Sequence, residues 1–178
     1  METNDTSVTT ASVGVRYGLL LALTGILVDF AVRMAGFSFL TYAIAGVLAA
    51  LVVGIVWLVV AHKKFKQNNG GLMTFSQGLT ISIIMLLIAG IVSSLFNYFY
   101  VHVIDPEFVN NLKSQMREFM ERNNVPDDQI EKSTARFDEM KTNLGKALID
   151  GLIRGVGSGL VLGVIVSAFT KRSAPEFE

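Results

Sequence analysis

Two pairs of charged residues with the same spacing are the part of this sequence best suited to chemistry. Asp29 and Arg33 form one Asp-x-x-x-Arg pair, and Asp150 and Arg154 form the other. Residues four apart lie on the same face of a helix, so each pair can form an ion pair along its own helix. Both pairs interrupt otherwise apolar segments. A charge inside a membrane costs several kcal/mol unless it is paired or hydrated, and by default it indicates a functional site.

The elements that must position these pairs are long apolar segments. Residues 37–61 and 75–101 contain no charged residue and no proline. Each is longer than the roughly 20 residues that a helix needs to cross a bilayer. Residues 17–36 and 148–170 are also long enough and carry the two Asp/Arg pairs. The alternative for these two weaker segments, buried helices of a soluble core, does not account for the two uncharged spans. We therefore predict an all-α protein, an integral membrane four-helix transmembrane bundle that forms one domain over residues 1–178.

A polar stretch separates the third and fourth predicted spans. Residues 103–146 hold sixteen of the thirty charged residues. Phe108, Leu112, Met116 and Phe119 recur at three- and four-residue spacing, as an amphipathic helix requires. The pattern predicts an extramembrane amphipathic helical hairpin over about residues 105–146. Its apolar stripe either contacts a partner or the lipid surface, or the two arms pack on each other. Residues 1–13 are predicted to be a short disordered tail.

The two Asp/Arg pairs are expected in the same leaflet. The first helix runs toward the hairpin and the fourth helix starts from it, so both pairs lie on the hairpin side. One interpretation is a polar cluster or water-filled vestibule that binds a proton, an ion or a small anion. The alternatives are an ion-pair network that connects the first and fourth helices, or side chains that reach the interface. The candidate cluster consists of Asp29, Arg33, Asn97, His102, Asp150 and Arg154.

Small residues recur at intervals of four in the predicted spans. Small side chains let helix backbones approach closely, which is how helices associate in lipid. A row of small residues at this spacing indicates a tight helix contact, within one chain or between two chains. The alternative is a substrate path lined by glycine. The most regular row is in the fourth span and consists of Gly151, Gly155, Gly159 and Gly163.

Basic residues indicate the orientation. Lys and Arg close to span ends tend to stay in the cytoplasm. With four spans, both termini share one side with the second loop, and both termini are predicted to be cytoplasmic. Residues 62–66 (HKKFK) either anchor this topology or contact anionic headgroups. The basic residues close to the span ends on that side are Arg16, Lys63, Lys64, Lys66, Lys171 and Arg172.

Composition argues against several classes of activity. Fifteen basic and fifteen acidic residues give a net charge of zero, so the sequence lacks the basic footprint of a nucleic-acid-binding protein. The chain has no Cys and only two His residues, which are a poor basis for a metal site. It contains no Gly-rich phosphate loop, zinc motif or nucleophile elbow. We predict no enzyme activity, no catalytic residue, no metal and no cofactor.

Three short segments carry a family resemblance. They are residues 17–20 (YGLL), residues 71–78 (GLMTFSQG) and residues 98–108 (YFYVHVIDPEF). In this order and spacing, over about residues 14–172, the chain resembles DUF4199, a family of small four-span bacterial membrane proteins of unknown function. The resemblance implies a multi-pass protein of the bacterial inner membrane. It carries over no catalytic residue.

The sequence favours a non-enzymatic accessory or scaffold subunit. Its expected contacts are the lipid bilayer and a protein partner or a second copy, through the 105–146 hairpin or the glycine row of the fourth span. The alternative is a small transporter or channel-like component that uses the intramembrane Asp/Arg cluster.

Overall fold

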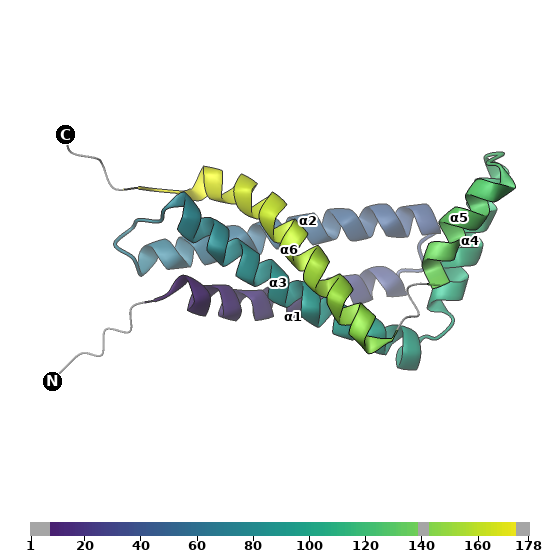
Figure 1. Ribbon diagram of the computed structural model, residues 1–178, viewed down its shortest axis with the longest axis horizontal. Coiled ribbons are helices and arrows are strands. Elements are labelled where there is room, and N and C mark those ends of the chain that lie inside the picture. Colours follow the sequence, from purple (N-terminus) through teal and green to yellow (C-terminus); the bar gives the residue numbers. More distant parts are fainter. Residues whose placement is uncertain (1–7, 139–142, 174–178) are drawn as a thin grey trace.

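The computed structural model describes residues 8–138 and 143–173. Within these residues four long helices lie along the long axis of the molecule, and all are apolar enough to cross a membrane. The start of α1 and the end of α6 lie at the same end of the bundle (Figure 1). The prediction of an all-helical membrane protein with four spans is confirmed. The long helices are α1 (Thr10–Met34), α2 (Phe39–Gln67), α3 (Phe75–Phe99) and α6 (Leu144–Thr170).

The first helix begins earlier than the sequence pattern predicts. Thr9 caps α1, because its side-chain oxygen accepts a hydrogen bond from the backbone N–H of Ser12 at 3.1 Å. Residues 10–13 of the predicted tail are therefore helical, and residues 1–7 of it lie outside the described part of the chain. A capping residue is polar and does not contribute to the hydrophobic pattern. The pattern therefore does not reveal that this hydroxyl-rich segment begins the helix.

Short loops connect the first three helices. Gly36 has a φ of +64° in the turn between α1 and α2, a backbone conformation that L side chains rarely adopt. α2 extends past the predicted end at residue 61 to Gln67, with Lys64 and Lys66 in its last turn, where cations favour the helix dipole. Thr74 and Gln77 form a capping box at the start of α3. These local signals set the length of each span.

α3 is the central helix of the bundle and packs most extensively against α6 and α1. Its contact with α6 is a close backbone approach. A Cβ built at Gly155 would lie 2.7 Å from the Leu86 carbonyl oxygen and 2.7 Å from the Leu87 Cα, and one at Gly159 would lie 2.9 Å from the Ile83 Cα. The four glycines of the predicted row, Gly151, Gly155, Gly159 and Gly163, are all buried. The row therefore serves a contact within the chain.

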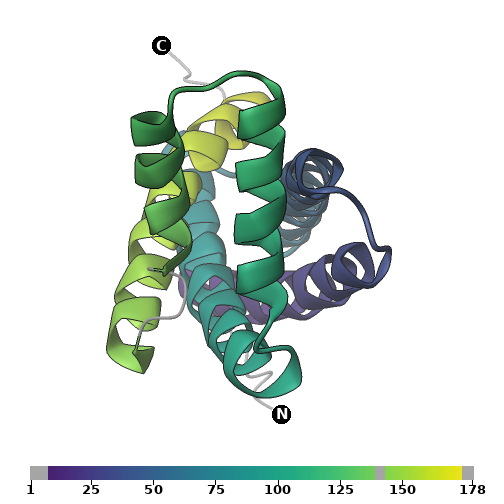
Figure 2. The same ribbon diagram turned by 90° about the vertical axis from the view of Figure 1, so that its right-hand side faces the viewer.

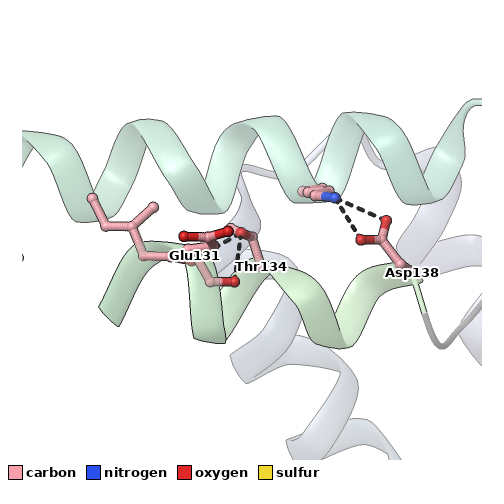
Figure 3. A network of polar contacts seen from close by, with 5 residues as sticks. Glu131, Thr134 and Asp138 are labelled. Atoms are coloured by element: carbon pink, nitrogen blue, oxygen red, sulfur yellow. Dashed lines mark hydrogen bonds and ion pairs between the residues drawn. The ribbon is translucent and has the colours of Figure 1, made fainter. Parts of the chain in front are cut away.

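The opposite end of the bundle is covered by two shorter helices. A π-helical turn, η1 (Tyr100–Ile104), follows α3, and α4 (Phe108–Arg122) and α5 (Asp127–Asp138) come next. α4 and α5 lie side by side across this end of the bundle (Figures 1 and 2). The Lys113 ammonium donates to both carboxylate oxygens of Asp138 at 2.8 Å, which joins the two helices (Figure 3).

An apolar cluster attaches the two short helices to the long ones. Phe108 and Phe137 are each 9% exposed. Phe108 packs edge-on against Tyr42 of α2, with ring centroids 5.7 Å apart, and Phe137 packs edge-on against Phe39 of α2 at 6.1 Å. The buried part of these apolar stripes therefore packs within the chain, whereas Phe119 of the α4 stripe is 43% exposed.

Candidate functional site: a charged cavity between the helices

A cavity of about 930 Å³ lies between the four long helices. Its size is at the upper end of the range usual for small-molecule sites. Toward the middle of the bundle its walls are apolar and include Leu21, Val53, Leu86 and Ala89. Its polar lining comes from α5 and from the parts of the long helices nearer α4 and α5, as far as the middle of α6. It includes Asp29 and Arg33 of α1, Tyr42 of α2, Ser93, Ser94 and Asn97 of α3, Arg136 of α5, and Asp150, Arg154 and Ser158 of α6.

Arg33 is held by contacts from three other parts of the chain. Its Nε donates to Asp29 at 2.8 Å and its Nη2 donates to the Asn97 side-chain oxygen at 3.0 Å. The guanidinium carbon lies 4.4 Å from the centroid of the Tyr100 ring and 4.5 Å from that of Phe108. The Arg33 side chain is only 6% exposed. Arg33 therefore joins α1 to α3 through its hydrogen bond to Asn97, and to η1 and α4 through two cation–π contacts.

One nitrogen of Arg33 has no acceptor. Nη1 is buried and has no hydrogen-bond partner among the described residues. Two aromatic rings, Tyr100 and Phe108, pack against the guanidinium, so they supply electrostatic compensation for the buried charge in place of an oxygen acceptor. The Arg33 side chain is therefore held in the protein interior.

The second Asp/Arg pair has the same spacing and a different environment. Arg154 Nη2 lies 4.0 Å from the Asp150 carboxylate, at the outer limit of an ion pair. The Arg154 side chain is 77% exposed and that of Asp150 is 36% exposed. Both residues line the cavity. Arg154 therefore retains hydrogen-bond donors that a ligand or water can use.

The structure brings together most of the predicted polar cluster. Asp29, Arg33, Asn97, Asp150 and Arg154 all line the same cavity. His102 does not. Its ring stacks on Tyr98 with centroids 4.2 Å apart, and its Nδ1 donates to the Tyr98 carbonyl at 2.8 Å. The π-helical turn changes the direction of side chains after Phe99, and simple helical spacing could not anticipate this.

The cavity lining includes residues that sequence reasoning missed. Arg136 reaches the cavity because α5 lies across the end of the bundle, and nothing in its local sequence signals this. Gly25, Gly46 and Gly157 line the cavity, and a Cβ built at any of them would meet no atom within 4 Å. Unlike the α6 row, these glycines border open space.

A second polar group lies at the other end of the bundle. His62 is fully buried, and its Nδ1 lies 2.7 Å from the Thr170 hydroxyl. Its Nε2 lies 3.0 Å from the Gly78 carbonyl oxygen and 3.1 Å from the Ser82 hydroxyl. His62 therefore connects α2 with α3 and α6. The sequence pattern grouped it with the basic residues of the loop, whereas the structure places it in the interior.

Metal ligation has no evident candidate in the parts of the chain described, residues 8–138 and 143–173. No three His, Asp or Glu side chains come close enough together there to hold a metal ion. Asp29 and Asp150 are the acidic groups among the cavity-lining residues.

Comparison with known proteins shows the family of this chain. The family model described as "Protein of unknown function (DUF4199)" matches residues 16–172, a range that includes every residue lining the cavity. No curated protein and no solved structure matches the chain. The resemblance stated from three short segments is confirmed, and the chain belongs to the DUF4199 family.

Proposed function

We propose that this protein is a ligand-binding component of the bacterial inner membrane, a small transporter or channel-like protein without enzymatic activity. The observation that carries the proposal is the cavity of about 930 Å³ that reaches all four charged residues of the two Asp/Arg pairs. A structural ion-pair network between α1 and α6 would instead bring these side chains into direct contact. In the described residues each pair is internal to its own helix.

The energetics of the second pair support this function. Arg154 and Asp150 are separated by 4.0 Å and are both accessible from the cavity. A charge so loosely paired within a membrane needs water or a ligand to offset its loss of hydration. A hydrated cavity supplies that water. Such a cavity can serve as a transport path or as a binding site.

The proposal includes an orientation. Lys63, Lys64, Lys171 and Arg172 lie at the bundle end that contains the α2–α3 loop and the end of α6. Basic residues beside span ends favour the cytoplasm. In this orientation the termini are cytoplasmic, and α4 and α5 lie outside the membrane on the other side, next to the charged end of the cavity.

Cysteine labelling tests the hydrated cavity. The chain contains no Cys, so each introduced thiol is the only one. Gly46→Cys on α2 and Ser93→Cys on α3 place a thiol at the cavity, and Val47→Cys places one on the lipid-facing side of α2, where Val47 is 61% exposed. A water-soluble thiosulfonate reacts with the thiolate, which forms only in water. We expect labelling at Gly46→Cys and Ser93→Cys and none at Val47→Cys; equal reactivity at positions 46 and 47 would contradict the proposal.

The second candidate is the accessory or scaffold subunit favoured by the sequence. The observation for it is a shallow pocket of about 290 Å³ between the start of α2 and α4, beside Phe119, which is 43% exposed. The glycine row of α6 is occupied by α3, so this surface is where a protein partner or second copy would bind. Light scattering in mild detergent tests self-association. A strictly monomeric wild type, unchanged by Phe119→Ser, would argue against it.

A further inference from the structure

The cavity is divided chemically along the bundle axis. The last part of α1, the first part of α6 and Arg136 of α5 supply its charged groups. Toward the middle of the bundle the walls are apolar, with Leu21 of α1, Val53 of α2 and Leu86 of α3. A ligand that fills both parts needs a charged head and an apolar body, because burying an unpaired charge against the apolar walls is costly.

The sign of the charge follows from the lining residues. They include three arginines, Arg33, Arg136 and Arg154, and two aspartates, Asp29 and Asp150. Asp29 is engaged by Arg33 at 2.8 Å. The lining therefore carries one positive charge in excess, and the head group that it favours is a monoanion.

The arginines differ in availability. Arg33 is enclosed by Asp29, Asn97 and two aromatic rings. Arg154 is 77% exposed and lies 4.0 Å from Asp150, so its guanidinium can form the bidentate hydrogen bonds that carboxylates accept. Arg154 is the residue that would bind the head group, with Arg136 adding positive potential from α5.

The apolar part of the cavity is kept open by glycine. Gly25, Gly46 and Gly157 border it from α1, α2 and α6, and a Cβ at each would meet nothing within 4 Å. Small residues there leave room for a flexible chain along the helices. Resting on the proposed function, we infer that the ligand is an acidic amphiphile with one acyl chain, a long-chain fatty acid, with its carboxylate on Arg154 and its chain between α1, α2 and α6.

The test is binding of labelled oleate to the full-length protein in a non-ionic detergent. We expect saturable binding of one oleate, with oleyl alcohol, which lacks the charge, and acetate, which lacks the chain, competing at least about tenfold more weakly. Arg154→Gln should weaken oleate binding by about tenfold or more, because a charge-assisted hydrogen bond is lost. Its control, Arg117→Gln on the exposed surface of α4, should leave binding unchanged.

A second pair of variants tests the position of the chain. Gly46→Leu adds a side chain to the cavity at a position where a Cβ meets no atom within 4 Å, and it should abolish oleate binding while the protein keeps its thermal stability. Val47→Leu makes a similar enlargement on the lipid-facing side and should have no effect. Equal binding of oleate and oleyl alcohol, or equal effects at positions 46 and 47, would overturn the inference.

Three further outcomes distinguish a failure of this inference from a failure of the proposed function. Binding of phosphatidylglycerol in place of oleate would overturn the single-chain assignment and identify a phospholipid as the occupant. Failure of oleate to bind, together with thiol labelling at Gly46→Cys and Ser93→Cys, would overturn the inference and leave the hydrated cavity in place. Absence of both binding and labelling would overturn both.

Discussion

The guanidinium of Arg33 lies over the ring of Tyr100, with 4.4 Å between the guanidinium carbon and the ring centroid. This contact joins the last turn of α1 to the π-helical turn that follows α3. The Phe108 ring, at 4.5 Å, brings the start of α4 to the same cation. One side chain therefore connects the long helices with the pair of helices that covers the charged end of the cavity.

The two Asp/Arg pairs should differ sharply in their effect on stability. Arg33→Gln removes a buried cation and leaves Asp29 without its partner, so we expect a loss of about 2–4 kcal/mol in the free energy of unfolding. Arg154→Gln removes a loosely paired charge whose side chain is 77% exposed, so it should cost less than about 1 kcal/mol. Thermal unfolding in detergent measures both, and equal shifts in the melting temperature would show that Arg33 has no special structural role.

Because α3 and α6 approach closely, a single methyl group added between them should lower the stability of the protein strongly. Gly155→Ala would place a Cβ 2.7 Å from two backbone atoms of α3, so the helices must separate at a cost of about 1–3 kcal/mol. Gly157→Ala lies on the same helix with no atom within 4 Å and should be neutral or slightly stabilising. Detergent melting curves compare the two variants. A stable Gly155→Ala protein would mean that α3 and α6 are not packed backbone to backbone.

Removal of the His62 imidazole should weaken the bundle at the end opposite α4 and α5. His62→Leu leaves the Thr170 and Ser82 hydroxyls without their ring partners in a buried region, at an expected cost of about 1–3 kcal/mol. Lys64→Leu, two residues away on an exposed position of α2, is the control and should have little effect on the melting temperature. If the two variants melt alike, the His62 hydrogen bonds contribute nothing to stability.

The proposed orientation predicts opposite labelling of two exposed positions. Ser114→Cys lies on α4, and Asn68→Cys lies at the end of α2 beside the α2–α3 loop. With cytoplasmic termini, a membrane-impermeant maleimide should label Ser114→Cys in intact spheroplasts and Asn68→Cys only after permeabilisation. The reverse pattern would invert the orientation. If neither position is labelled in intact spheroplasts, α4 is either inaccessible to the reagent or on the cytoplasmic side.

Hydropathy made the four spans predictable, and small-residue spacing predicted a close helix contact by α6 without naming its partner. Uncharged segments of more than 20 residues leave few alternatives to a membrane helix, because lipid cannot hydrogen-bond an exposed backbone. The glycine row of α6 predicted a close contact, and only the packing showed that α3 fills it. Cap residues such as Thr9 carry no hydrophobic signal, so the start of α1 was placed too late.

The polar residues within the spans, and the end of the bundle that they share, were predictable from the sequence through the direction of each helix. The two Asp-x-x-x-Arg pairs have the same spacing, and tertiary packing gives them different surroundings. Arg33 is enclosed because η1 and α4 fold over it, and Arg154 is accessible because α6 borders a cavity there. The physical reason is that spacing along a helix sets only which side chains share a face. The burial of that face depends on contacts between segments that are far apart in the chain.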